Sequence, residues 1–308
     1  MNAVIGIDTS NYTTSIAFYD GFGGENCSKL LPVKQGELGL RQSDAVFAHM
    51  KSLPELSGRL FSHIQAANIT AVGVSTRPRA VEGSYMPCFL VGYSHAKLLA
   101  DALNVPLIEV SHQQGHVAAS LWSAGHMELL SQPHLAWHLS GGTTELLMVE
   151  PVGKNVACTK IGGTSDISAG QLIDRTGQLL QLPFPSGKHL DALSQEAVGK
   201  DLFKVKCADM TFSLSGVQNK VQQYHEKNGI PAETAAYALR CVAFAVFQAT
   251  KQALDLHPGL PVVFSGGVAS NTMLRQVLEP LNPIFAQPQY STDNAMGVAV
   301  LAHRAMEV

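Results

Sequence analysis

Apolar runs of strand length alternate along the chain with longer stretches in which apolar residues recur at helical spacing. The chain opens with an apolar strand, a polar turn over residues 8–11 and a second strand over residues 14–19, which predicts a hairpin with a polar tip. Residues 39–67 have helical spacing. A buried strand over residues 71–75 and a helix over residues 87–103 follow. This alternation predicts a protein of layered α/β class.

Two later segments place glycines directly after an apolar strand. The segment "HLSGGTTELLMVE" repeats the format of the opening hairpin, with two strands around a small polar turn, and this repetition favours a duplicated chain. Near the end, a buried strand runs into Gly266 and Gly267 before a helix. A strand, a Gly-Gly pair and a helix N-terminus can together cradle an anion or a nucleotide. One Ser-Gly-Gly is a weak signal, but two such turns and the hairpin are a stronger one.

Composition limits the class of protein. With 308 residues, 46% hydrophobic and 15% charged, the chain can bury a large core, most naturally in two lobes. No apolar run approaches the roughly 20 residues that span a bilayer. Met1 and Asn2 lead straight into a strand without a leader-like segment. We therefore expect a soluble, cytoplasmic protein that does not enter a membrane.

The charge and the cysteines exclude further classes. A net charge of −3 and a pI of about 6.4 lack the basic excess of a stand-alone nucleic-acid binder, so any RNA contact is expected to be local or shared with a partner. The five cysteines are odd in number, widely separated and without a C-x-x-C pair, which favours reduced thiols over disulfides. None of them looks like part of a metal cluster or a nucleophile.

His112 and His116 are the residues that first suggest a metal. Two imidazoles four positions apart share one face of a helix and can hold one ion, with a third ligand from elsewhere. An isolated pair of this kind is more often a pair of surface or hydrogen-bonded histidines. His126 lacks a partner at this spacing, and His134 and His138, although four apart, lie in the apolar strand before Ser140 and not in a predicted helix. The pair alone therefore leaves both interpretations standing.

Motifs in order along nearly the whole chain give a family resemblance. They are "GIDTS", "HQQGH", "LSGGTTEL", "SDISAGQLIDR", "PFPSGK", "FSLSGV", "SGGVASNTMLR" and "STDNA". On these motifs the chain resembles the TsaD family, also called the glycoprotease or M22-type family, as a divergent paralogue. The resemblance implies a duplicated actin-like ATPase fold (ASKHA, ribonuclease H-like), with two lobes around a nucleotide cleft. We expect lobes at residues 1–108 and 109–308, the second carrying the metal and nucleotide motifs; the last helix could pack back on the first lobe.

The resemblance also implies site residues. The family's metal ligands match His112, His116 and Asp293, and such a set leaves coordination positions for a ligand's oxygens on one divalent ion, iron or zinc, with magnesium as a further candidate. ATP or an acyl-adenylate is the implied nucleotide. Asp174 could instead be a solvated charge and Asn271 a plain helix cap. Asp8 and Thr9 are expected to face the same cleft. The implied nucleotide contacts are His138, Leu139, Ser140, Gly141, Gly142, Asp174, Gly187 and Asn271.

Several positions depart from the family pattern. Neutral groups in place of carboxylates remove general-base capacity and change the local field. We therefore expect the cleft to be retained, with neutral side chains in place of several reactive ones that line it in the family. The departures are Asn11, Tyr12 and Thr13 for Cys-Asp-Glu, Gln114 for the glutamate of H-x-E-G-H, Thr143 for a histidine, residues 76–79 for Ala-Gly-Pro-Gly, and Ile167 and Gln171 for acids near Asp166.

Three functions follow from the resemblance. The first is the family reaction, metal-dependent transfer of a threonylcarbamoyl group from its adenylate to an adenosine beside the anticodon of tRNA. The second is transfer of a carbamoyl-type group to another acceptor, and the third is a non-catalytic nucleotide-binding role in a modification complex. Arg77 and Arg79 could contact anionic substrate or RNA. A zinc protease is not expected because no H-E-x-x-H is present. Possible partners are tRNA and a second copy or paralogue, forming a homodimer or heterodimer.

Overall fold

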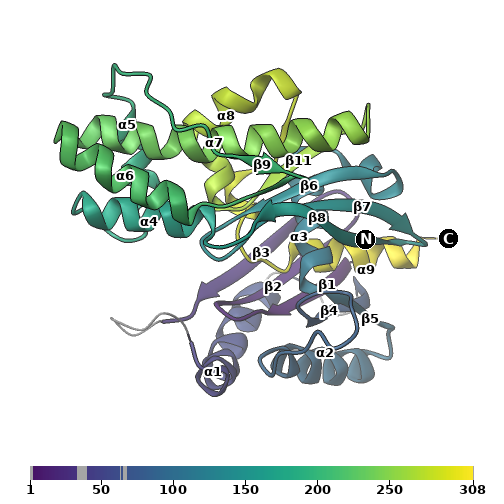
Figure 1. Ribbon diagram of the computed structural model, residues 1–308. Helices are drawn as coiled ribbons and strands as arrows, with labels where there is room; N and C mark the ends of the chain where they lie inside the picture. The colour runs from purple at the N-terminus through teal and green to yellow at the C-terminus, as the bar shows by residue number, and fades with distance from the viewer. Residues whose placement is uncertain (1–2, 33–39, 63, 65–67, 308) are drawn as a thin grey trace. The chain divides into compact units, whose positions relative to one another are not determined.

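The computed structural model describes residues 3–32, 40–62, 64 and 68–307 (Figure 1). The chain divides into two compact units. The first comprises the described residues within 1–132, 150–158 and 293–308, and the second comprises residues 133–149 and 159–292. The first unit therefore contains residues 109–132, which the sequence analysis assigned to the second lobe, and the last helix, for which it allowed packing on the first lobe. Among the described helices, none combines the length and the apolar character needed to cross a bilayer.

The first unit is built on a five-stranded sheet with the order β3-β2-β1-β4-β5. The predicted opening hairpin is confirmed, since β1 and β2 pair antiparallel from Val4–Tyr19 to Thr9–Thr14. β3 continues this antiparallel pairing, whereas β4 and β5 run parallel to β1. The strands are β1 (Ala3–Thr9), β2 (Thr13–Tyr19), β3 (Gly24–Leu30), β4 (Ile69–Arg77) and β5 (Leu107–Ser111).

Helices cover both faces of this sheet. α1 (Gln42–Phe61) and α2 (Phe89–Leu103) bury their apolar residues against Ile5 and Ile7 of β1 on one face. The alternate residue Val4 packs on the other face with Ala302 of α9, as the period of two along a strand requires. The helical prediction for residues 39–67 is realised as α1; residues 39, 63 and 65–67 lie outside the described residues. α3 (His112–Ala124), the short 3₁₀ helix η2 (Met127–Ser131) and α9 (Met296–Met306) complete the unit.

α9 packs against α3 and the sheet through glycines. A Cβ atom on Gly297 of α9 would lie 1.8 Å from the carbonyl oxygen of Gly115 in α3, so only a glycine allows this approach. On the sheet side, Cβ atoms on Gly6 and Gly73 would likewise collide with the backbone of α9. The backbones of α3 and α9 are therefore almost in contact. Consequently Asp293, three residues before α9, lies beside the first turns of α3.

The second unit contains most of a seven-stranded sheet with the order β12-β11-β6-β7-β8-β10-β9; residues 150–158, at the end of β7 and the start of β8, belong to the first unit. β6 pairs antiparallel with β7 and parallel with β11, so the strands that precede both predicted Gly-Gly turns lie side by side. The strands are β6 (His134–Leu139), β7 (Thr144–Val152), β8 (Asn155–Thr164), β9 (Cys207–Ala208), β10 (Thr211–Phe212), β11 (Val262–Ser265) and β12 (Ile284–Phe285).

α7 is the central helix of the second unit. It is rich in alanine and buried along most of its length, and Trp137 of β6 donates a 2.9 Å hydrogen bond to Thr250 in it. The small alanines let the helix lie close to the sheet and to the neighbouring helices. The helices are α4 (Ala169–Leu179), α5 (Gly187–Ser194), α6 (Ser215–Asn228), α7 (Pro231–Leu256) and α8 (Thr272–Leu278), with the 3₁₀ turns η3 (Gly267–Ser270), η4 (Glu279–Leu281) and η5 (Pro288–Tyr290).

Candidate functional site

α3 begins with a capping box that fixes where its histidines lie. The Ser111 hydroxyl accepts a hydrogen bond from the Gln114 backbone N–H at 3.3 Å, and the Gln114 Oε1 accepts from the Ser111 N–H at 2.8 Å. Two of the otherwise unpaired N–H groups of the first turn are thereby satisfied. The helix starts at His112, and His116 follows one turn later on the same side. The two imidazole rings meet edge to face with their centroids 4.4 Å apart.

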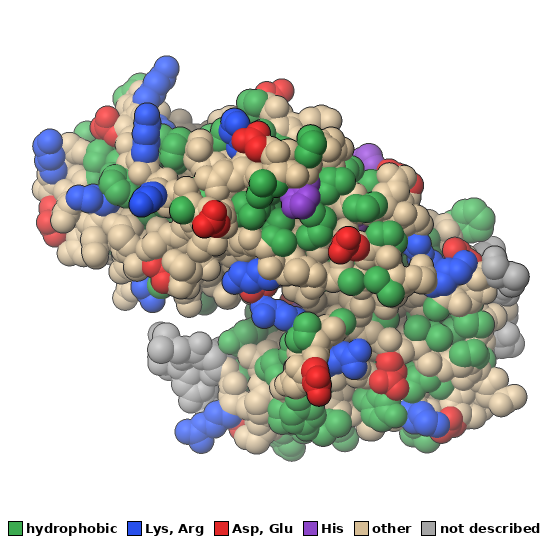
Figure 2. All heavy atoms as spheres, turned by 45° about the vertical axis from the view of Figure 1, so that its right-hand side comes forward, with side chains coloured by type: hydrophobic (Ala, Val, Ile, Leu, Met, Phe, Trp, Pro, Cys, Tyr) green, Lys and Arg blue, Asp and Glu red, His purple; other side chains and the backbone are tan. Residues whose placement is uncertain are grey.

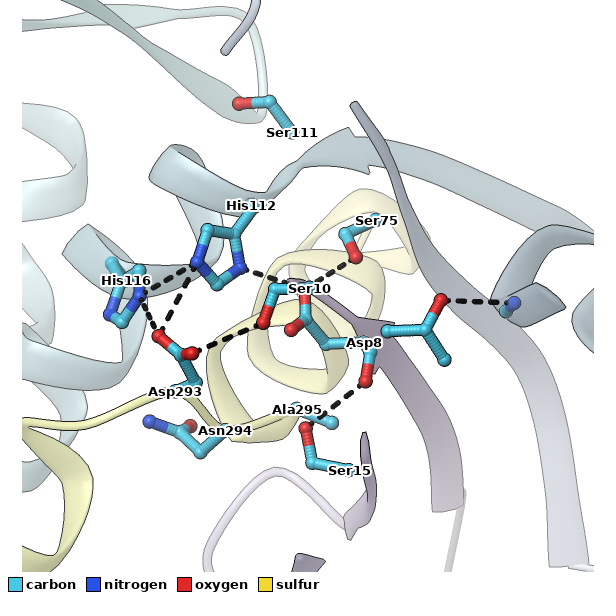
Figure 3. A network of polar contacts seen from close by, with 12 residues as sticks. Asp8, Ser10, Ser15, Ser75, Ser111, His112, His116, Asp293, Asn294 and Ala295 are labelled. Atoms are coloured by element: carbon cyan, nitrogen blue, oxygen red, sulfur yellow. Dashed lines mark hydrogen bonds and ion pairs between the residues drawn. The ribbon is translucent and has the colours of Figure 1, made fainter. Parts of the chain in front are cut away.

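Asp293 completes a cluster with the two histidines (Figure 3). His116 Nε2 lies 3.0 Å from His112 Nε2 and 3.1 Å from Asp293 Oδ1, and His112 Nε2 lies 3.5 Å from the same oxygen. Ligand atoms bound at about 2.0–2.1 Å around a tetrahedral ion are roughly 3.3 Å apart. The three atoms thus have the chemistry and the mutual spacing of one face of a metal site.

Further polar residues of the first unit hold these three in place (Figure 3). Asp8 is fully buried at the end of β1, and its Oδ1 accepts a hydrogen bond from His112 Nδ1 at 2.9 Å and another from the Ser75 hydroxyl. The Ser10 hydroxyl donates to Asp293 Oδ2 at 3.3 Å. A carboxylate on the second nitrogen of a ligating histidine fixes the ring and its tautomer. Asp8 therefore directs the Nε2 of His112 toward the cluster.

The charges of the cluster are strongly coupled. Burial lowers the pKa of His112, but the negative charges of Asp8 and Asp293 outweigh this effect and raise it to about 10. Burial raises the pKa of Asp293, yet hydrogen bonds and charge from His112 and His116 hold it well below its usual range. The cluster therefore favours a positive charge at its centre, which a proton or a metal ion can supply.

Thr9 and Asn11, in the tip of the opening hairpin, bind neighbouring parts of the first unit. The buried Thr9 hydroxyl donates to Cys88 O and accepts from Gly92 N, each at 3.0 Å, and so fixes the start of α2. Asn11, which replaces the family cysteine, accepts a 2.7 Å hydrogen bond from Gln42 of α1. These contacts give both side chains structural roles. A nucleotide contact of Asp8 or Thr9 remains a prediction.

Two exposed arginines flank the start of α3. Arg77 ends β4 and Arg79 follows it, and the carbonyl of Pro78 between them accepts a 3.0 Å hydrogen bond from Gln113 N. Gln113 is the residue after His112. The loop that replaces the family's Ala-Gly-Pro-Gly segment thus places two cations next to the first turn of α3.

In the second unit, the turn over residues 140–143 joins β6 and β7. It is closed by hydrogen bonds from Ser140 N to Thr143 O and from Thr143 N to the Ser140 hydroxyl, at 2.8 and 3.1 Å. A Cβ atom on Gly141 or Gly142 would meet no atom within 4 Å. The backbone of this turn is therefore accessible, as a turn that approaches a phosphate must be. Leu139 before it is buried and His138 is half-buried.

α4 begins directly against this turn. The hydroxyl of Ser168, the N-cap of α4, donates to Gly141 O at 2.5 Å, and Ala169 N donates to the Thr144 hydroxyl at 2.8 Å. A Cβ atom on Gly170 would lie 2.5 Å from the Gly141 Cα, so a glycine is required for this packing. A helix N-terminus is thereby held beside a glycine turn, which is a favourable arrangement for an anion.

Hydrogen bonds link the remaining predicted nucleotide residues into one series. Asp174 of α4 accepts from Ser186 N at 2.8 Å, just before Gly187 begins α5, and burial raises the pKa of its carboxyl. Asp191 of α5 accepts from Thr272 N at 3.0 Å. Asn271 caps α8 by accepting from Leu274 N at 3.0 Å. Asp174 and Asn271 thus have structural partners, and the structure brings their elements together with the Gly141 turn.

Some of these residues carry no clear signal in the sequence. Ser75 lies at the end of a buried strand, with nothing in its surroundings to mark it as a partner of Asp8. Ser111 and Ser168, in contrast, each precede a glutamine by three positions, and this spacing could have identified both helix caps. The capping serines were therefore predictable, whereas Ser75 was not.

The cysteines agree with the sequence analysis. All five are free thiols. Burial raises the pKa of Cys88 and Cys241 to about 11 and that of Cys158 to about 12. Since the thiolate is the nucleophilic form, these thiols are unsuited to nucleophilic catalysis near neutral pH.

Comparisons with solved structures agree with the fold described above. Among solved structures, full-length HypF in its phosphate- and nucleotide-bound form superposes with a TM-score of 0.64 at 14% identity, over 99% of this chain and 47% of HypF. A ROK family glucokinase from Streptomyces griseus, in complex with glucose and AMPPNP, gives a TM-score of 0.54 at 13% identity, over 98% of this chain and 99% of the kinase. The predicted actin-like ATPase fold is thereby confirmed.

The sequence comparisons are more specific. The tRNA N6-adenosine threonylcarbamoyltransferase of Carboxydothermus hydrogenoformans is 30% identical in an alignment of 318 positions that covers 97% of this chain and 91% of the relative. The sequence profile of TsaD, tRNA N6-adenosine threonylcarbamoyltransferase, matches residues 37–300. The chain therefore belongs to the TsaD family of tRNA N6-adenosine threonylcarbamoyltransferases.

Proposed function

We propose that this protein transfers a threonylcarbamoyl group from its adenylate to an adenosine of tRNA beside the anticodon, with a divalent metal held by His112, His116 and Asp293. The observation that carries the proposal is the convergence of these three ligand atoms in a member of the TsaD family. Two imidazoles and one carboxylate suit zinc or iron better than magnesium, which prefers oxygen ligands.

The residues around the triad have separate roles in this proposal. A bound divalent ion would supply Lewis-acid charge for the oxygens of the donor and polarise its carbonyl group. Asp8 holds His112 in the tautomer that leaves Nε2 available, and Ser10 fixes the second oxygen of Asp293. Only three protein ligands are offered, so coordination positions remain for the donor.

The donor's nucleotide would bind in the second unit. The accessible backbone of Gly141 and Gly142 and the N-terminus of α4 would face its phosphate. His138, Asp174, Gly187 and Asn271 are the further contacts that we propose for the sugar and the base. HypF and the glucokinase, which share the fold, are both described with a bound nucleotide, and this supports nucleotide binding by the present chain.

The tRNA contact is proposed to be local and shared with a partner. On the face drawn in Figure 2, Lys and Arg side chains lie interspersed with Asp and Glu, in agreement with the net charge of −3. Arg77 and Arg79, next to the start of α3, are the proposed contacts to anionic substrate. A second copy or a paralogous protein would supply the remainder of the RNA surface, and such a complex would act in the cytoplasm, where tRNA is used.

A carbamoyl-type transfer to a different acceptor is the second candidate. It is favoured by the replacement of Cys-Asp-Glu by Asn11, Tyr12 and Thr13 while all three metal ligands are kept. Retention of the ligands argues against a third role, a non-catalytic nucleotide-binding partner, because a scaffold does not require them.

A nucleoside profile of total tRNA distinguishes the tRNA reaction from transfer to a different acceptor. We expect threonylcarbamoyladenosine to disappear by mass spectrometry when the gene is deleted, to return with the wild-type gene, and to stay absent with His112→Ala. An unchanged profile after deletion would reject the tRNA reaction, and capture of labelled donor by a non-RNA metabolite would then support the second candidate.

A further inference from the structure

The side chain of Gln114 makes two different hydrogen bonds at the start of α3. Its Oε1 accepts from the Ser111 N–H, and its Nε2 donates to the backbone carbonyl of Val156 at 2.6 Å. Both residues are buried: Gln114 is 7% exposed and Val156 is 1% exposed. Residues 150–158 belong to the first unit, so this bond ties the helix that carries the histidines to a separate segment of the same unit.

The amide group can make both bonds, whereas an ionised carboxylate cannot. A glutamate, which the H-x-E-G-H pattern of the family has at this position, could accept from Ser111 N but could not donate to Val156 O when ionised. Its second oxygen would instead lie against the carbonyl oxygen of the buried Val156, which would lose the Gln114 donor. The replacement of an acid by Gln114 therefore adds a tether and does not merely remove a charge.

This tether acts on the turn that carries the first metal ligand. His112 is the first helical residue, and the N–H groups of a first turn have no partners inside the helix. The orientation of this turn is consequently set by its cap and by contacts from outside, of which the bond to Val156 is one. We propose that Gln114 is a positioning residue that holds the first turn of α3, and with it His112, in the orientation needed for metal binding. The inference rests on the proposed metal site.

The chain provides a matched control in the second unit. Ser168 and Gln171 form the same capping box at the start of α4, where Gln171 Oε1 accepts from Ser168 N at 3.1 Å. Gln171 is exposed, and no acceptor for its Nε2 is present among the described residues. A change of Gln171 to glutamate keeps every bond of its box, whereas the same change at Gln114 loses the bond to Val156.

The test is a titration of purified metal-free protein with Zn²⁺ against a competing chromophoric chelator. Gln114→Glu is compared with the wild type, with Gln171→Glu and with Gln114→Leu, which removes the amide without burying a charge and serves if the glutamate variant does not fold. Loss of a group that orients a metal ligand typically weakens metal binding about 10- to 100-fold. We expect about a tenfold or greater loss for both Gln114 variants and none for Gln171→Glu.

Thermal unfolding of the metal-free variants separates positioning from stability. If Gln114 has only a structural role, its variants should unfold at a lower temperature. The Zn²⁺ affinity of their folded form should then stay within about twofold of wild type, which is less than the tenfold or greater loss expected for a residue that orients a metal ligand. That result would overturn the proposal, and so would a wild-type protein that binds no Zn²⁺. Failure of the tRNA reaction would show separately, as missing product from wild-type protein whose Zn²⁺ affinity still responds to Gln114.

Discussion

α3 and α4 begin with the same Ser-x-x-Gln capping box, yet the two helices open onto different kinds of site. Around α3, side chains bond to side chains: Asp8, His112, His116 and Asp293 are already in contact. Around α4, the box lies against the turn at Gly141, where the backbone faces open space. The same capping sequence therefore begins two different sites. At α3 the side chains are already held by bonds to one another, and at α4 the backbone turn leaves room for a ligand.

The glycines of the two regions differ in the same way. Near α3, Gly297 is required because the protein's own backbone occupies the space that a side chain would need. Near α4, Gly141 and Gly142 have no such neighbour, and in our proposal the absence of side chains there leaves space for the phosphate of the donor. The predictions below test this contrast.

Substitution of Gly297 should have the largest effect. In Gly297→Ala the new methyl group collides with Gly115 O, which forces α9 away from α3, and the free energy of unfolding should fall by about 3 kcal/mol. Zn²⁺ affinity should fall as well, because Asp293 precedes α9. Gly58 is a matched control: it is helical, exposed and without neighbours, so Gly58→Ala should stabilise the protein by up to about 1 kcal/mol. Equal stability of the two variants in urea denaturation would refute the close packing.

Neutralising Asp8 should weaken metal binding without removing a ligand. Asp8→Asn keeps the shape of the side chain but loses the charge that orients His112, so Zn²⁺ affinity should drop about 10- to 100-fold in the chelator competition. Asp174→Asn changes a carboxyl group in the second unit and should leave this affinity unaltered. A drop in both variants would mean that the two regions are not chemically separate.

Metal affinity should rise with pH. Because the pKa of His112 is raised to about 10 in the metal-free protein, its proton must leave when the metal binds, and affinity should increase about tenfold per pH unit between pH 6 and 8. The stability of the metal-free protein should change in the opposite direction. The contribution of protonated His112 to the free energy of unfolding is complete below about pH 6.5 and is lost as the pH rises through about 10. Asp8→Asn should flatten the affinity profile, whereas an affinity independent of pH in the wild type would refute the coupling.

The smallest effect on stability is expected at Gly141. Since a Cβ there meets nothing, Gly141→Ala should change the free energy of unfolding by less than about 0.5 kcal/mol. Binding of an ATP analogue, followed by calorimetry, should nevertheless weaken, because the methyl group takes the space proposed for phosphate. Unchanged nucleotide binding would remove the turn from the proposed site.

Sequence periodicity was sufficient for the opening hairpin, for α1 and for placing both histidines on one helix face. Asp293 lies 177 positions from His116, and only the family resemblance connected them before the structure did. The packing of α3 on α9, which depends on Gly297 and places residues 109–132 in the first unit, has no local signal. Likewise, the Ser-x-x-Gln spacing could have indicated one bond of Gln114 but not its second, to Val156, because a contact 42 residues away is set by tertiary structure.

The metal content of the purified protein tests the central claim most directly. After loading with Zn²⁺ and removal of excess ion, elemental analysis should find about one ion per chain in the wild type, as a single three-ligand site requires, and none in His116→Ala. His126→Ala, at a partly exposed histidine outside the cluster, should retain the ion. A wild type without metal, or a His116→Ala variant that binds it equally well, would contradict the account.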